Sequence, residues 1–235
     1  MIYGLVARGF NAGGFNLTAP SGSETFRTEK SWNYEVGART SLCDDKVTAS
    51  VAWFYIDWDD MQLSQFNALT GGFVVNAGES DSTGAELEIT AKPTDEVQLF
   101  GGIGVMDTEL KRFTDQFGQD VSGDNLPFAP EWTANVGSQL TMDVSEDLQL
   151  FARAEYFYVG TFYYDAGNGG GENYDLANFR VGCEGKNWRV DAWLNNAFDE
   201  HYVPVAFQPN PADPTLFVGE SAAPRTYGFT VRLTF

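Results

Sequence analysis

The feature that most constrains the fold of this chain is an alternation of apolar and polar residues with a period of two. It is clearest in residues 225–235, where every second position is apolar: Tyr227, Phe229, Val231, Leu233 and Phe235. Similar alternation recurs in residues 33–42, 132–140, 148–156 and 188–195. Because successive side chains of a strand point to opposite faces, each segment predicts a strand with one apolar and one polar face.

The pattern predicts about ten strands and two kinds of connection. The strands are expected near residues 2–8, 31–42, 46–58, 82–92, 96–108, 130–142, 147–160, 174–184, 187–195 and 225–235. The short connections are residues 43–45, 93–95, 143–146 and 185–186, and the long ones are 9–30, 59–81, 109–129, 161–173 and 196–224. Short and long connections alternate, so all short turns fall at one end.

This sorting of loops, with strands of roughly ten residues, is typical of transmembrane barrels, which pair short periplasmic turns with long extracellular loops. We therefore predict an all-β fold, an antiparallel transmembrane β-barrel. The alternative is a soluble antiparallel sheet whose apolar face packs on a second layer. The sequence disfavours it, because no amphipathic helix of useful length is predicted to supply that layer.

Composition excludes other classes. The chain has 235 residues, of which 43% are hydrophobic, which rules out a disordered chain. With 33 acidic and 14 basic residues its net charge is −19, which argues against nucleic acid as a partner. Cys43 and Cys183 fall on distant predicted strands, so we expect no disulfide. No secretory leader precedes the first alternating segment, so if the chain works outside the inner membrane, we expect its beginning to be missing.

Several short motifs occur in a fixed order along the chain. They are YGLVARGF (3–10), GGFN (13–16), WNYEVG (32–37), FYIDWDDMQ (54–62), NAG (76–78), GAELE (84–88), PFAPEW (127–132), NNAFD (195–199) with Tyr202, and PRTYG (224–228). Together they resemble the C-terminal part of the barrel of TonB-dependent outer-membrane receptors of the ferric-siderophore type. The resemblance covers essentially the whole chain.

The resemblance implies a location in the outer membrane of a Gram-negative bacterium and energised uptake of a scarce, large nutrient, with a ferric siderophore as the expected ligand. It implies a barrel of 22 strands filled by an N-terminal plug, and contact with the TonB complex. No plug or TonB-contact motif is found, so residues 1–235 are interpreted as the C-terminal barrel segment. Its two outer strands would then lack partners, and we expect a curved, open sheet without a ladder between residues 2–8 and 225–235.

The loop residues expected to meet the ligand first combine aromatic and carboxylate groups: Trp58, Asp59, Asp60, Phe117, Phe162, Tyr163, Tyr164 and Phe207. No cofactor or metal is expected. The ligand class stays open, because a strongly acidic chain is a poor attractor for anionic ferric complexes. The acidic loops would instead hold divalent cations that bridge to lipopolysaccharide, or select cationic or neutral ligands.

The polar faces of the strands predict a mixed-charge inner wall. Its residues are Glu35, Arg39, Glu86, Glu88, Arg153, Glu155, Arg180, Glu184, Arg189, Asp191 and Arg232. We favour cross-strand ion pairing and contact with an inserted plug over substrate binding for these residues.

Aromatic rings near strand ends suit the headgroup level of a bilayer. Those residues are Trp53, Tyr55, Trp58, Trp132, Tyr156 and Tyr158. The terminal apolar series Tyr227, Phe229, Val231, Leu233 and Phe235 resembles the signal read by the outer-membrane barrel-assembly machinery.

Two other functions remain as alternatives. A ten-stranded barrel enzyme of the protease type would use His201, the single histidine, with Asp191 or Asp199. A lone histidine beside carboxylates is more often structural than a metal ligand or general base. The second alternative is a passive porin, which would show steady ion conductance.

Overall fold

The computed structural model describes residues 1–67, 69–115, 118–209, 213 and 215–235. Ten long antiparallel strands form one sheet, and each of them pairs with the next of these ten along the chain. They are β1 (Ile2–Asn11), β4 (Glu29–Leu42), β5 (Val47–Asp59), β8 (Glu79–Ala91), β9 (Val97–Leu110), β10 (Trp132–Ser145), β11 (Leu148–Tyr163), β12 (Gly171–Gly185), β13 (Trp188–Asn195) and β16 (Thr226–Leu233). The all-β, antiparallel prediction is confirmed.

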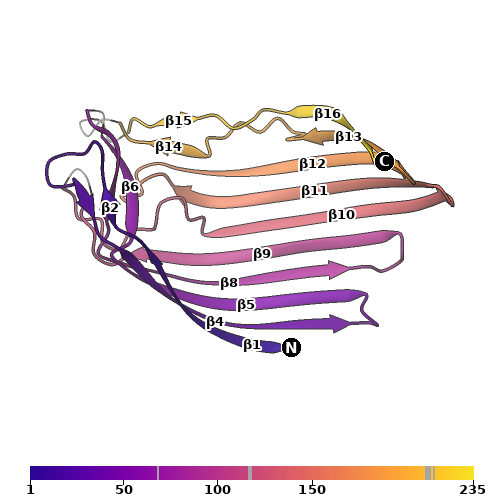
Figure 1. Cartoon of the computed structure of the whole chain (residues 1–235), viewed down its shortest axis with the longest axis horizontal. Helices are drawn as coiled ribbons and strands as arrows, with labels where there is room; N and C mark the ends of the chain where they lie inside the picture. Colours follow the sequence, from indigo (N-terminus) through magenta and orange to yellow (C-terminus); the bar gives the residue numbers. More distant parts are fainter. Residues whose placement is uncertain (68, 116–117, 210–212, 214) are drawn as a thin grey trace.

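The sheet is open. β1 pairs with β4 and β16 pairs with β13, and among the described residues no ladder joins β1 to β16. Figure 1 shows these two strands at opposite edges of a curved sheet. The prediction of an open sheet is confirmed, and both edges keep unpaired backbone donors and acceptors.

The two ends of the sheet differ as the sequence predicts. The short turns, the N-terminus and the C-terminus lie at one end, and the long connections gather at the other (Figure 1). The first tight turn places Cys43, Asp44 and Asp45 at φ values of 56°, 55° and 66°. Aspartate tolerates this left-handed backbone better than most residues, which suits the turn.

Three features of the strands were not predicted. β10 continues through the expected 143–146 turn to Ser145, because a bulge between Asp143 and Ser145 lets the ladder continue. β11 and β12 extend toward each other, so their connection shrinks to residues 164–170. Three small hairpins also form within the long connections: β2 (Gly14–Phe15) with β3 (Thr25–Phe26), β6 (Gln62–Asn67) with β7 (Gly71–Asn76), and β14 (Val205–Phe207) with β15 (Val218–Glu220).

We call the described residues of 12–28, 60–78, 111–131, 164–170 and 196–225 the loop layer. The buried apolar cluster of the chain is centred there: Ala77, Leu110, Phe113, Val121, Leu126 and Ala166. Only Leu110 of these lies in a strand of the sheet, at the last position of β9. The core therefore sits at the loop end and covers one end of the sheet.

The apolar face of the sheet is exposed. Val136, Val231 and Phe229 are 60%, 65% and 80% exposed, as expected for side chains that meet lipid rather than a second protein layer. The described residues include no helix that is long and apolar enough to cross a membrane.

The aromatic residues of the predicted headgroup belt divide between the two faces. Trp53, Tyr55, Trp132, Tyr156 and Tyr158 share the apolar face, where Trp132 stacks on Tyr158 with ring centroids 4.3 Å apart. Trp58 lies five positions after Trp53 in β5, which places it on the opposite face, and it packs against the buried cluster. The belt interpretation is therefore wrong for Trp58.

Candidate functional site

The polar face of the sheet collects the predicted inner-wall residues. Directly paired residues of a sheet share a face, and the register links Arg39 to Glu88 through Ser50, and Arg153 to Arg180. The same reasoning places all of them on one face: Glu35, Arg39, Glu86, Glu88, Arg153, Glu155, Arg180, Glu184, Arg189, Asp191 and Arg232. Their contact with a plug stays a prediction.

Five aromatic rings on this face each lie over the glycine directly opposite on the next strand. The pairs are Tyr3–Gly37, Phe54–Gly84, Phe100–Gly137, Phe151–Gly182 and Trp193–Gly228. A Cβ atom at any of these glycines would meet the ring. Glycine is therefore required for the ring to lie along the wall, which keeps the polar face flat.

Arginines stack on three of these rings. The Cζ atoms of Arg39, Arg153 and Arg189 lie 5.9, 4.4 and 4.2 Å from the ring centroids of Tyr3, Phe100 and Phe151. Guanidinium groups at this distance are attracted by the negative face of the ring. Each stack therefore has three layers: arginine, ring and glycine.

Carboxylates complete the stacks. Glu35 accepts a hydrogen bond of 2.7 Å from the Tyr3 hydroxyl, and Glu155 pairs with Arg153 at 2.7 Å. Arg189 pairs with Glu184 and Asp191, both at 3.2 Å, and Arg180 lies 3.6 Å from Asp191. The face therefore carries ion pairs whose rings and arginines hold each other in place.

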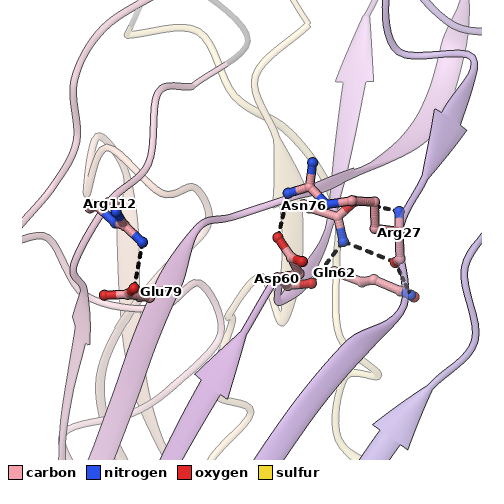
Figure 2. A network of polar contacts seen from close by, with 6 residues as sticks. All are labelled: Arg27, Asp60, Gln62, Asn76, Glu79 and Arg112. Carbon is pink, nitrogen blue, oxygen red and sulfur yellow. Dashed lines mark hydrogen bonds and ion pairs between the residues drawn. The ribbon is translucent and has the colours of Figure 1, made fainter.

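The loop layer is joined by a polar network around the base of the β6–β7 hairpin (Figure 2). Asn76 accepts a hydrogen bond from the Arg27 backbone N–H at 2.6 Å and donates to the carbonyls of Arg27 and Asp60 at 3.0 and 2.7 Å. Gln62 donates to the carbonyls of Ala12 and Arg27, both at 3.0 Å. The network therefore ties the 12–28 connection to the hairpin.

All four lysines and arginines of the loop layer pair with carboxylates. Arg27 pairs with Asp60 and Arg112 with Glu79, both drawn in Figure 2. Lys111 lies 2.5 Å from Asp81, and Arg225 lies 4.0 Å from Asp199. The hydrogen bond from Arg27 holds the pKa of Asp60 below its usual range, so this carboxylate stays charged.

The sequence-predicted ligand residues are dispersed. Asp60 is paired with Arg27, Trp58 packs on the buried cluster, and Asp59 is exposed at the end of β5. Phe162 is only 5% exposed, and Tyr163 pairs with Gly171 in the sheet. Phe117 lies outside the described residues.

Two of the predicted residues, Tyr164 and Phe207, line one cavity of about 70 Å³ in the loop layer. The β6–β7 hairpin, the 111–131 and 164–170 connections and the β14 region contribute to its wall. Phe66 also lines the cavity, and the ring centroids of Phe66 and Phe207 lie 4.3 Å apart. Asp115 and Asp165 add two carboxylates.

Sequence reasoning missed Phe66, Asp115 and Asp165. The available signal was weak: Asp165 directly follows the aromatic run 162–164, and Phe66 precedes a pair of glycines.

Tyr164 is fixed by a 2.8 Å hydrogen bond from its hydroxyl to the Val203 carbonyl. Burial and the neighbouring Glu172 raise the pKa of Tyr164 to about 12, so it remains a neutral donor.

The carboxylates considered for an enzyme have other partners. Asp191 lies between Arg180 and Arg189, and Asp199 accepts a 2.9 Å hydrogen bond from the Arg225 backbone N–H. His201 is exposed. Within the described ranges no group of three His, Cys, Asp or Glu residues is arranged to hold a metal ion, and both cysteines are free thiols.

Known proteins resemble the chain in both sequence and structure. The family model described as "TonB dependent receptor-like, beta-barrel" matches residues 1–197. The pesticin receptor of Yersinia pestis is 27% identical over 241 residues, which cover all of this chain and 34% of that protein. The chain thus spans about a third of the length of the curated relatives that it matches.

Solved structures agree with this assignment. The ferric yersiniabactin uptake receptor of Yersinia pestis has a TM-score of 0.81 at 26% identity, covering 100% of this chain and 35% of that receptor. The siderophore receptor PiuA of Acinetobacter baumannii shares the fold, with a TM-score of 0.71 at 20% identity and coverage of 99% and 33%. Together with the family match over most of the chain, these findings show that the chain belongs to the TonB-dependent receptor family and forms part of its β-barrel.

Proposed function

We propose that this chain is part of an outer-membrane receptor that takes up a ferric siderophore with energy from the TonB complex. The family consists of outer-membrane proteins of Gram-negative bacteria, and the chain shares that location. The observation that carries the proposal is the match over the whole chain to the ferric yersiniabactin uptake receptor. The loop layer supports it, because its loops bring aromatic rings and a cavity to one end of the sheet.

Residues 1–235 would supply the C-terminal barrel segment, and the rest of the receptor would supply the plug and the TonB contact. The flat polar face supports this division. Rings that lie along the wall leave the space in front of the sheet open for another domain. The exposed apolar face would meet outer-membrane lipid, and the acidic loop layer would meet divalent cations bound to lipopolysaccharide.

The proposal is tested in the source bacterium with the full-length gene. Deleting the gene should abolish uptake of iron-55 from its siderophore under iron limitation, and the intact gene should restore it. A protonophore should stop the restored uptake, because TonB acts through the proton gradient. Uptake that survives deletion of the gene, or that the protonophore leaves unchanged, would overturn the proposal.

We also propose that the C-terminal series is read by the barrel-assembly machinery. Tyr227, Phe229, Val231 and Leu233 project from the apolar face of β16, and Phe235 lies beyond its end, fully exposed. Deleting Phe235 from the full-length receptor should lower the folded, heat-modifiable fraction in outer membranes. An unchanged fraction would show that Phe235 is not part of the signal.

The receptor should act without covalent chemistry. His201→Ala should leave iron uptake intact, because His201 is exposed and Asp191 and Asp199 have other partners. Hydrolytic activity lost on His201→Ala would favour the enzyme alternative. Steady conductance of the full-length protein in planar bilayers would favour a passive porin.

A further inference from the structure

The cavity between the loops has a definite chemical character. The rings of Phe66 and Phe207 meet at an interplanar angle of 41°, and Leu63, Pro127 and Ala166 add apolar surface. Tyr164 contributes a ring whose hydroxyl is held by the Val203 carbonyl. The cavity therefore combines aromatic and apolar groups with the polar side chains of Ser64, Gln65 and Gln208.

Its charge is negative. Asp115 and Asp165 line the pocket, and no lysine or arginine is among the described residues that do so. Asp165 is oriented by the backbone, because its carboxylate accepts a 2.8 Å hydrogen bond from the Gly169 N–H. Burial raises the pKa of the Asp124 carboxyl, and the charge of Asp165 adds to this shift.

The rest of the loop layer does not offset this charge. Arg27, Lys111, Arg112 and Arg225 are each paired with a carboxylate. An anionic group entering the pocket would therefore face carboxylates, and among the described residues of the loop layer every lysine and arginine is already paired. A cation would be attracted by both the carboxylates and the ring faces.

We propose that this pocket receives a positively charged apolar side group of the ligand, such as a pendant alkylammonium, and disfavours a carboxylate or catecholate group. The inference rests on the proposed function and names the ligand chemistry. A cavity of about 70 Å³ holds one side group rather than a whole ferric complex, since pockets for whole small molecules measure roughly 300–1,000 Å³.

The test uses the full-length receptor in detergent with 4-fluorophenylalanine at position 207, so that fluorine NMR reports on the pocket. Three probes of similar length are titrated: n-butylammonium, n-butanol and butyrate. We expect a saturable shift of the Phe207 resonance with butylammonium, and an affinity for it about tenfold above that for butyrate. Butanol should fall between them.

Asp165→Asn provides the matched variant, because asparagine keeps the size and the acceptor for the Gly169 N–H but removes the charge. It should reduce the preference for butylammonium over butyrate to about threefold or less. Asp147→Asn is the control and should keep the full preference, because Asp147 and its ion-pair partner Lys186 lie in the short β10–β11 and β12–β13 turns. The fluorine resonance of each Asp→Asn variant is first recorded without any probe. A resonance that matches that of the labelled receptor with both aspartates in place shows that the pocket of the variant is intact.

The outcomes separate this inference from the proposed function. Equal affinities for butylammonium and butyrate, no saturable shift with any probe, or a full preference retained by Asp165→Asn would overturn the pocket assignment. The iron-uptake experiment does not depend on these probes. A receptor that imports iron but shows no charge preference therefore keeps its function and loses the pocket assignment.

Discussion

The sheet and the loop layer place their apolar side chains in opposite ways. In the sheet, Val136 and Phe229 are 60% and 80% exposed, whereas Ala77 and Leu110 at the loop end are fully buried. The sheet is held by backbone hydrogen bonds and needs an apolar solvent for its outer face. The loop layer buries a core of its own, as a small water-soluble protein does.

This difference teaches that the same kind of substitution has different consequences in the loop layer and on the outer face of the sheet. A smaller side chain leaves a cavity in the loop layer, where the core is packed by protein. On the outer face of the sheet, lipid fills the space that a smaller side chain leaves, and only a charge is strongly unfavourable.

The largest effect is expected in the loop core. Leu110→Ala in the full-length receptor should destabilise the loop layer by about 2–5 kcal/mol, because Leu110 is fully buried. Hydrogen exchange of the 111–131 amides should accelerate while β10 and β11 stay protected. The control, Leu17→Ala, removes a fully exposed leucine of the same layer and should change nothing. Equal acceleration in the sheet would show that the two regions unfold together.

The next largest effect concerns the faces of β10. Val136→Arg puts a charge on the exposed apolar face and should destabilise the folded protein by about 2–4 kcal/mol near the bilayer midplane. Asn135→Arg, one position earlier, puts the same charge on the polar face and should have a much smaller effect. Urea-dependent unfolding from lipid vesicles measures both. Equal losses of stability would refute the assignment of faces.

The sheet was predictable because its signal is periodic. Each predicted strand has an observed counterpart, since alternation specifies both a strand and its faces. The errors lie at the ends, where periodicity stops. β10 passes through the predicted turn by means of the bulge between Asp143 and Ser145, and a bulge has no sequence period.

The pocket was not predictable for the same reason. Phe66 and Phe207 meet although they lie on hairpins far apart in the chain, and neither hairpin shows a clear alternation. Aromatic type and loop position suggested Tyr164 and Phe207, which line the pocket. The same reasoning also suggested the aromatic Phe162, which is buried, and the carboxylate Asp60, which is paired with Arg27. Residue type alone does not show which loop side chains face a shared space.

A smaller effect tests the flat polar face. Gly137→Ala places a methyl group against the Phe100 ring, which also carries Arg153, and should destabilise the barrel by about 1–3 kcal/mol through overpacking. Gly4→Ala is the control, because a methyl group there has only a carbonyl oxygen 3.8 Å away. The heat-modifiable fraction measures both variants. If Gly4→Ala lowers the heat-modifiable fraction as much as Gly137→Ala does, strand glycines matter only for backbone freedom.

The smallest effect concerns a contact between two connections of the loop layer, 12–28 and 60–78. Asp60 and Arg27 have side chains that are 36% and 71% exposed, so removing the pair with Asp60→Asn should destabilise the 12–28 connection by only about 0.2–1 kcal/mol. The folded state lowers the Asp60 pKa below its ordinary value of 3.8. The contribution is therefore complete at pH values above 3.8 and is lost as the pH falls through the lower, folded-state pKa.

Hydrogen exchange of the 12–28 amides should show this dependence. The difference in protection between the unsubstituted receptor and Asp60→Asn should be constant near neutral pH, shrink on acidification below 3.8, and also shrink with added salt. Asp120→Asn removes a loop carboxylate whose hydrogen bonds stay within its own turn, to Ser122, and should leave the 12–28 amides unchanged. If Asp120→Asn loosens the 12–28 connection as much as Asp60→Asn does, the change in net charge rather than the loss of the Arg27 contact explains the effect, and the hydrogen bonds of Asn76 and Gln62 hold this connection without it.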